Sequence, residues 1–362
     1  MHIFYFRGKN LRLMIDMGHP AHVHLFKNAI WELQKKGHRV LVTAIDKEVT
    51  IDLLKVYNIE HIVVGKLGSG KLDLISEWIK RDYKILKIAK KFNPDILMGM
   101  SNPCAAHVSR ILGKKCILMD DTEHASFTHK ITYPFANVIC TPDCFKKDLG
   151  QKQVRYKGCH ELAYLHPNYF SPDPTVLHEL GINEQDNFFL VRFAAFQAAH
   201  DIKSHNFRTE FIIPLIKKLE KKGKIIISSE RKLDPYLTKY QYSLSPDKYH
   251  SVLYYSKMYI GEGSTSAEEA ALLGVPALHF ERLNINGNPC GITSYIGIID
   301  SLQNKYGLLY SYYDESELLM KVDELLLDID DTKKQWEKKR DNFLNDMDDV
   351  TNFIVKVVER YS

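Results

Sequence analysis

Short apolar runs alternate with helical patterns through the first half of the chain. The first run, residues 11–17, leads into Gly18-His19-Pro20, and apolar residues at helical spacing follow from His22 to Lys36. Further short apolar runs lie at residues 40–44, 62–64, 96–98, 116–119 and 138–140. Because strands that are apolar throughout are buried on both faces, this alternation predicts a parallel sheet with helices on each side.

The alternation stops in an aromatic, proline-containing stretch at residues 164–174 and then resumes. Strands are predicted at 188–193, 224–228, 258–260 and 275–280, helices at 207–221 and 264–273, and a charged helical tail at 316–361. We therefore expect two α/β domains, residues 1–160 and 176–330, joined by a linker at 161–175. The C-terminal helices, residues 331–362, are candidates for crossing back onto the first domain.

Composition narrows the class of protein. The 362 residues are 45% hydrophobic and 26% charged, which is typical of a globular chain with a core. The net charge of +4 is too small to favour a nucleic-acid partner, although it suits an anionic ligand. Six cysteines without a Cys-x-x-Cys pair indicate reduced thiols, and no signal-peptide core is evident, so we expect a cytoplasmic protein.

The segment from Gly261 to Pro276 predicts a phosphate site. A strand ends in a small, hydroxyl-rich turn, Gly263-Ser264-Thr265-Ser266, and a helix begins there. The first backbone N–H groups of a helix are unsatisfied and its dipole is positive at that end, so a phosphate binds well. Glu269 follows one turn later, where a carboxylate reaches the two hydroxyls of a ribose. The alternative is an ordinary capped helix with solvated glutamates.

The first strand ends at a second candidate segment, Gly18-His19-Pro20-Ala21-His22. Histidine titrates near neutral pH, so His19 or His22 is a candidate general base, or a ligand to a phosphate or a sugar. Gly18 would shape the turn at the ligand. A zinc site is a further interpretation, but no cysteine or carboxylate is obviously placed with these histidines, and we predict no metal. The remaining alternative is helix capping with a surface histidine.

Two more segments carry candidate residues at strand ends. Arg192 and His200 frame a stretch of small residues after the first strand of the second domain, where a guanidinium can bind phosphate through two parallel hydrogen bonds. The alternative is that Arg192 pairs with a nearby carboxylate. In the first domain, Asp121 and Glu123 follow an apolar strand and are candidate catalytic bases. Their alternative is a solvated acidic turn that caps the next helix.

The sixteen residues from Gly261 to Pro276 resemble a signature of the UDP-N-acetylglucosamine 2-epimerases, Asp-Ser-Gly-Gly-x-x-Glu-Glu-Ala followed by Leu-Gly-x-Pro, with no gap in the spacing. The resemblance implies a GT-B fold, in which two Rossmann-like domains face each other across a cleft. It also implies that Glu269 holds the ribose, with Gly263 and Ser264 at the phosphates. Met100 stands where these epimerases have a catalytic aspartate, which argues against 2-epimerase activity. The overall pattern also resembles a mainly archaeal family of hypothetical proteins.

These features favour a glycosyltransferase-like enzyme with a nucleoside diphosphate sugar as its donor and no other cofactor. The alternatives are a sugar-nucleotide 2-epimerase and a non-catalytic nucleotide-sugar-binding protein. The acceptor is undefined; a sugar or a lipid-linked molecule would serve. Peripheral membrane contact is one interpretation of a lysine-rich helical stretch, and a solvated helix face is the other. The lysines of that stretch are Lys84, Lys87, Lys90 and Lys91.

Overall fold

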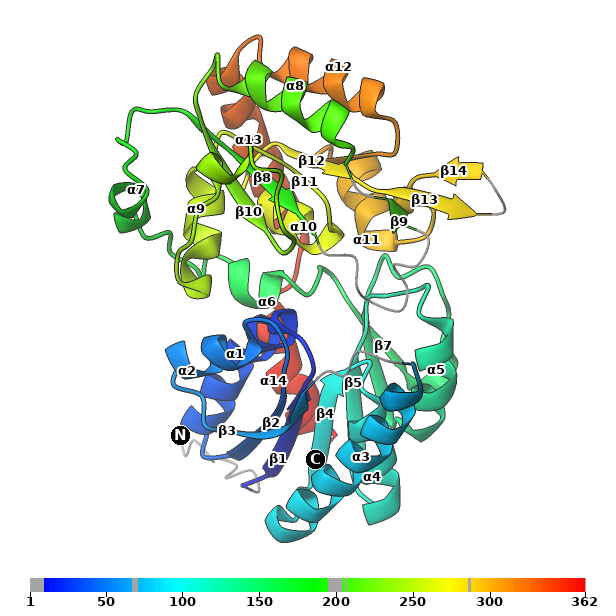
Figure 1. Cartoon of the computed structure of the whole chain (residues 1–362). Helices are drawn as coiled ribbons and strands as arrows, with labels where there is room; N and C mark the ends of the chain where they lie inside the picture. The colour runs from blue at the N-terminus through cyan, green and yellow to red at the C-terminus, as the bar shows by residue number, and fades with distance from the viewer. Residues whose placement is uncertain (1–9, 67–70, 195–203, 206, 286–287, 362) are drawn as a thin grey trace. The chain divides into compact units, whose positions relative to one another are not determined.

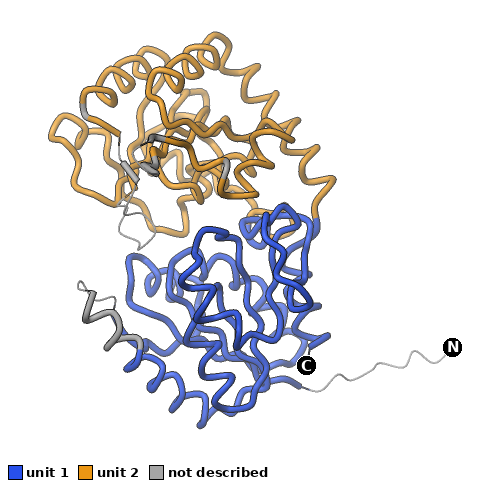
Figure 2. The backbone as a smooth tube through the Cα atoms, turned by 90° about the vertical axis from the view of Figure 1, so that its right-hand side faces the viewer, with its two compact units in different colours: residues 1–164, 348–362 blue, residues 165–347 orange. Residues whose placement is uncertain are grey.

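The computed structural model describes residues 10–66, 71–194, 204–205, 207–285 and 288–361. It divides into two compact units, residues 1–164 with 348–362 and residues 165–347 (Figure 2). Each unit is built on one parallel sheet with interleaved helices. The α/β class expected from the alternating pattern is therefore confirmed.

The first unit contains a seven-stranded parallel sheet in the order β3-β2-β1-β4-β5-β6-β7 (Figure 1). Its strands are β1 (Arg12–Met17), β2 (Arg39–Asp46), β3 (His61–Lys66), β4 (Ile96–Met100), β5 (Lys115–Met119), β6 (Val138–Pro142) and β7 (Gln153–Tyr156). Its helices are α1 (Pro20–Lys35), α2 (Thr50–Val56), α3 (Lys71–Phe92), α4 (Pro103–Leu112), α5 (Ser126–Thr132) and α14 (Val350–Arg360), with α6 (Leu162–Leu165) at the boundary of the unit.

The second unit contains a five-stranded parallel sheet in the order β10-β8-β11-β12-β15. Its strands are β8 (Phe188–Phe193), β10 (Lys224–Ser229), β11 (Met258–Gly261), β12 (Ala277–Phe280) and β15 (Leu309–Tyr312). Its helices are α7 (Thr175–Glu179), α8 (Thr209–Leu219), α9 (Tyr249–Tyr255), α10 (Ser264–Leu272), α11 (Gly297–Asp300), α12 (Glu315–Leu325) and α13 (Ile329–Asp346). A small antiparallel sheet, β14-β13-β9, accompanies them, with β9 (Ser204–His205), β13 (Arg282–Ile285) and β14 (Asn288–Cys290).

The strand order creates a topological switch point in each sheet. In the first unit the chain runs outward from β1 through β2 to β3 and then returns to place β4 on the other side of β1. In the second unit β10 and β11 flank β8 in the same way. Ligands of open α/β sheets bind outside the carboxyl ends of the strands at such a point. The ends of β1 and β4, and those of β8 and β11, are therefore where sites are expected.

The units differ from the expected domains at both ends. The second unit begins at Leu165, inside the predicted linker, and extends to Met347, because α13 packs on it and Trp336 donates a 2.7 Å hydrogen bond to the Leu308 carbonyl. Only α14 belongs to the first unit, where Thr351 donates to the carbonyl of Ala163 at 2.7 Å. Of the helices in the predicted C-terminal segment, α14 belongs to the first unit and α13 to the second.

Burial of apolar strands supplies the core of each unit. Residues such as Leu13, Ile15, Leu190 and Ile260 are almost fully buried, as the uninterrupted apolar runs predict. All six cysteines are free thiols, so no disulfide cross-links either unit. Among the described residues, no helix combines the length and the apolar character that a membrane span requires.

Candidate functional site

Helix α10 begins at the switch point of the second unit without a capping side chain. Its N-cap is Gly263, with φ 84°, and no side-chain hydrogen bond or acidic residue occupies the first turn. Ser264 is half-buried, Thr265 is exposed and Ser266 is buried. The backbone N–H groups of this turn have no partner within the helix, so the predicted hydroxyl-rich turn is built as an anion site requires.

Gly261 allows this turn to lie close to the sheet. A Cβ atom at Gly261 would lie 2.5 Å from the Tyr259 hydroxyl and 2.9 Å from Cβ of Arg192. Tyr259 is fully buried and donates to the Glu262 carbonyl at 3.3 Å, so it cannot move aside. Glycine is therefore needed at Gly261 by packing, and at Gly263 by the positive φ.

Glu269 lies one turn inside α10 and is buried. Its Oε1 atom is 2.9 Å from Nε2 of His250, which α9 contributes and which is also buried. This partner could not be predicted from the sequence, since His250 is 19 residues away in a different helix. The predicted ribose-binding role of Glu269 stays a prediction, and the contact shows that His250 orients the carboxylate.

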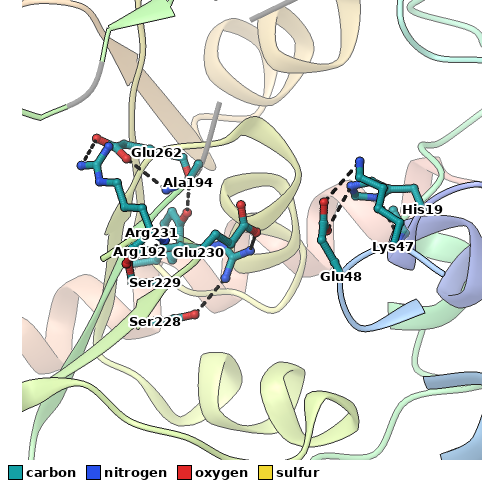
Figure 3. A network of polar contacts seen from close by, with 12 residues as sticks. His19, Lys47, Glu48, Arg192, Ala194, Ser228, Ser229, Glu230, Arg231 and Glu262 are labelled. Carbon is teal, nitrogen blue, oxygen red and sulfur yellow. Dashed lines mark hydrogen bonds and ion pairs between the residues drawn. The ribbon is translucent and has the colours of Figure 1, made fainter. Parts of the chain in front are cut away.

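Arg192 is held by protein groups at the end of β8 (Figure 3). Its guanidinium donates to the Ser228 hydroxyl at 2.8 Å and forms an ion pair with Glu230, and it also lies over the ring of Tyr249. The structure thus has the carboxylate pairing that was the alternative to phosphate binding. A phosphate contact by Arg192 stays a prediction and would have to compete with Glu230.

Glu262 is a further buried group, and it was not among the predicted site residues. Its carboxylate accepts from the backbone N–H of Ala194 at 3.0 Å and from the Arg231 guanidinium at 3.0 Å (Figure 3). It also accepts from the backbone N–H of Phe207. Burial raises the pKa of Glu262 to about 7, although Arg231 and the two N–H groups oppose the rise. Glu262 therefore ties the ends of β8 and β10 to the start of the α10 turn.

In the first unit, Asp16 organises the ends of β1 and β4. This buried carboxylate accepts hydrogen bonds from Thr43 at 2.7 Å and Asn102 at 2.7 Å, and it forms an ion pair with Arg81 of α3. Asn102 also caps α4. The sequence showed an acid at a strand end but not its partners, because Arg81 lies 65 residues away.

His19 and His22 shape the first turn of α1. The Nδ1 atom of His22 accepts from the Gly18 N–H at 3.1 Å, and that of His19 accepts from the Ala21 N–H at 3.2 Å. A neutral ring that accepts at Nδ1 carries its proton on Nε2. Burial, followed by the charges of His19, His160 and Arg81, lowers the pKa of His22 well below its usual value. His22 is therefore a neutral Nε2–H donor, and the predicted base role fits it poorly.

Figure 3 also shows the surroundings of His19, whose Nε2 lies 3.6 Å from Oε2 of Glu48, beside Lys47. The ring is 43% exposed, so this contact is a surface one. His19 acts as the N-cap of α1, which is the capping interpretation of this segment.

Asp121 pairs with a histidine beyond the end of β7. Its Oδ2 atom lies 2.7 Å from Nδ1 of His160, which is buried, and Thr122 donates to its other oxygen at 2.9 Å. Burial is the largest influence on Asp121 and would raise its pKa, but the charge and the hydrogen bond of His160, together with the hydrogen bond from Thr122, leave that pKa below its usual value. Glu123 is also buried and accepts from the Lys146 N–H at 3.2 Å. The acidic segment is therefore an internal network and not a solvated turn.

The remaining candidates are placed as follows. His200 lies outside the described residues. Met100 ends β4, so no acid occupies that position. Among the described residues, no group of histidine, cysteine and acidic side chains could hold a metal ion.

Solved structures share this architecture. A UDP-GlcNAc 2-epimerase from Neisseria meningitidis, solved bound to UDP-GlcNAc, has a TM-score of 0.64 at 11% identity and covers 97% of this chain and 100% of its own. The spinosyn forosaminyltransferase has a TM-score of 0.62 at 13% identity, covering 97% and 99%. A UDP-GlcNAc 2-epimerase from Methanocaldococcus jannaschii has a TM-score of 0.59 at 14% identity, covering 86% and 92%. The fold is therefore of the GT-B type, as the sequence resemblance implied.

Sequence comparison adds an archaeal relative and a family. An uncharacterized protein of Methanocaldococcus jannaschii is 24% identical over 282 residues, which cover 74% of this chain and 81% of the relative. The family model described as "Protein of unknown function (DUF354)" matches residues 11–362, and the chain belongs to this family.

Proposed function

We propose that this protein is an enzyme that binds a nucleoside diphosphate sugar at the start of α10 and transfers the sugar to an acceptor. The observation that carries the proposal is the uncapped, acid-free first turn of α10 at the switch point of its sheet. The similar solved structures support the ligand class, since they include a 2-epimerase bound to UDP-GlcNAc and a glycosyltransferase.

The second unit supplies the donor site in this proposal. The N–H groups of Ser264, Thr265 and Ser266 bind the diphosphate, and the helix dipole stabilises the negative charge that grows on the leaving group. Glu269, held by His250, accepts from the ribose hydroxyls. Since the helix start performs the task that a metal ion performs in other transferases, no metal is required.

The first unit supplies the groups for the acceptor. Asp121 is ionised beside His160 and takes the proton of the acceptor hydroxyl as that oxygen bonds to the anomeric carbon. His22 donates its Nε2–H to a substrate oxygen. The acceptor is a hydroxyl-bearing molecule, either a sugar or a lipid-linked one.

A 2-epimerase is the second candidate, because two of the similar structures have that activity in their names. It differs in needing no acceptor, so an epimerase converts the nucleotide sugar alone. Met100 at the end of β4 gives such a reaction no proton acceptor at that position.

The experiment compares two variants that add one negative charge to a helix start. Thr265→Asp places a carboxylate at the exposed second residue of α10, and Ser316→Asp does the same in α12. Both changes favour the helix dipole, so both variants should fold. We expect UDP-, GDP-, CDP- or dTDP-sugars to raise the Tm of wild type and Ser316→Asp, and not that of Thr265→Asp. A wild type that no nucleotide stabilises, or equal shifts in both variants, would contradict the proposal.

A further inference from the structure

The exposed face of α3 carries only lysine and large apolar side chains over the part of the helix whose side chains are described. Residues 79–92 expose Ile79, Lys80, Tyr83, Lys84, Lys87, Lys90 and Lys91. Ile79 is 66% exposed and Tyr83 57% exposed, and they lie four residues apart on adjacent turns. We call these seven side chains the α3 face.

Over residues 79–92, the one acidic side chain of α3 is turned away from this face. Asp82 turns toward α4, where its carboxylate lies 2.9 Å from Nδ1 of His107. Arg81 turns inward to Asp16. None of the five lysines forms an ion pair with an acidic residue in the part of the chain that the structure describes. Lys87 lies over the ring of Tyr83, with its Nζ atom 4.5 Å from the ring centroid, and no described acidic side chain neutralises the lysines, so they can interact with an external anionic partner.

Helix α4 extends the same chemistry. Helices α3 and α4 pack together through a shared cluster that includes Ile85, Ala89, Cys104 and Val108, with Phe92 and Leu112 at the same end. Beside Leu112, α4 exposes Arg110 and Ile111, the latter 63% exposed. Arg110 is basic and Ile111 is apolar, as on the α3 face.

We propose that the α3 face docks on an anionic lipid bilayer, with Ile79 and Tyr83 entering the interface and the lysines contacting lipid phosphates. Charge complementarity favours an anionic bilayer as the partner. The long lysine side chains can keep their charge at the lipid headgroups while the apolar side chains beside them insert into the bilayer interface. A nucleic acid would use the lysines but would leave Ile79 and Ile111 without a role. The α3 face belongs to the first unit and the α10 start to the second, so the inference does not depend on the proposed function.

Docking would also position the candidate site of the first unit. Arg81 is on the same helix as the α3 face and bonds Asp16 at the end of β1. A membrane bound to α3 would thus be linked through one side chain to the carboxyl edge of the sheet. A hydroxyl-bearing lipid would be presented beside that edge.

The test is co-sedimentation of the full chain with vesicles. We expect binding to phosphatidylcholine vesicles containing 30% phosphatidylglycerol, weak binding to pure phosphatidylcholine, and loss of most binding in high salt. Lys80→Glu with Lys84→Glu should lower the partition coefficient at least about tenfold. Lys334→Glu with Lys338→Glu, an exposed pair at the same spacing on α13, should leave it unchanged.

A second pair of variants tests the apolar contribution. Ile79→Ser with Tyr83→Ser should weaken binding to the anionic vesicles, whereas Met320→Ser with Leu327→Ser, two exposed positions of the second unit, should not. Circular dichroism checks that each variant is folded. No binding by the wild type, equal binding by the α3 and control variants, or tighter binding to a single-stranded oligonucleotide than to vesicles would overturn the proposal.

Discussion

Nε2 of His250 lies 2.9 Å from Oε1 of Glu269, and both side chains are buried beside the start of α10. A buried carboxylate needs a partner, since an unpaired charge in the interior is costly. His250 therefore fixes the direction in which Glu269 presents its carboxylate. The proposed ribose contact depends on that orientation.

Replacement of Glu269 separates ribose recognition from phosphate binding. Glu269→Gln keeps the volume of the side chain but weakens its acceptance from two hydroxyls, so we expect the affinity for UDP to fall about tenfold or more. Affinity for inorganic pyrophosphate, which has no ribose, should change little. Calorimetric titration of both ligands measures this, with Glu268→Gln, a buried neighbour, as the control. Equal losses of affinity for UDP and pyrophosphate would show that Glu269 does not bind the ribose.

The two acidic candidates of the first unit can be distinguished by their variants. We expect Asp121→Asn to lower turnover of the nucleotide sugar by at least about 100-fold without weakening donor binding, because a general base contributes that much to a rate. Glu123→Gln should have a smaller effect on the rate, since Glu123 bonds a backbone N–H. If Glu123→Gln proves the more damaging to kcat, the assignment of Asp121 is wrong.

Removal of His160 should change a pH profile. The charge of His160 holds the pKa of Asp121 down against burial, which raises it. In His160→Gln the two largest lowering contributions are removed while the Thr122 hydrogen bond remains, so the acidic limb of the kcat/KM profile should move to higher pH. A purely structural role would lower activity at every pH and leave the limb where it is.

Glu262 should make stability depend on pH. Its pKa is raised to about 7 in the folded chain, from a usual value of 4.5. The stabilisation from its protonated form is therefore complete below pH 4.5 and is lost as the pH rises through 7. Glu262→Gln removes this dependence, so the loss of unfolding free energy relative to wild type should be larger at pH 5 than at pH 8. The difference is up to about 3 kcal/mol, since a pKa difference of one corresponds to about 1.4 kcal/mol.

Urea unfolding of wild type and Glu262→Gln at pH 5 and pH 8 measures this loss of unfolding free energy. Glu262→Gln should be the less stable protein at both, because an amide cannot accept from Ala194 and Phe207 on both of its terminal atoms. Equal losses at pH 5 and pH 8 would show that the Glu262 carboxyl does not titrate in this range.

Two glycines test the packing of the α10 turn. Gly261→Ala forces a Cβ against Tyr259 and Arg192, so we expect a loss of about 1–3 kcal/mol in the free energy of unfolding. Gly65→Ala, in β3, meets no heavy atom within 4 Å and should have little effect. The Tm values of both variants measure the two losses of stability. Comparable decreases in Tm would mean that the contact at Gly261 is easily relieved.

The main strands and helices could be predicted because apolar periodicity reports burial directly. The runs at 11–17, 188–193 and 258–260 are buried strands of the two sheets. No strand was predicted at residues 284–288, which include parts of β13 and β14, because Asn-Ile-Asn-Gly-Asn has no apolar alternation. Strands β7 and β15 were also missed. Both are short, and β7 is only half-buried.

The candidate sites were only partly predictable, because strand ends can be found in a sequence and the partners of their side chains cannot. Asp121 was identified from its place after β5, whereas His160 lies 39 residues later, at the end of the predicted first domain, and was not among the candidates. Arg192 was expected at a phosphate, and its pairing with Glu230 depends on the register of β8 beside β10. Such contacts follow from tertiary packing and leave no periodic pattern.

The most direct measurement is a titration of the ¹⁵N-labelled protein with UDP, followed through its backbone amide resonances. If a diphosphate binds the helix start, the largest shifts belong to the amides of Ser264, Thr265 and Ser266, and inorganic pyrophosphate moves the same resonances. If those three amides stay unchanged while others shift, or if no resonance moves at millimolar nucleotide, the start of α10 is not the diphosphate site.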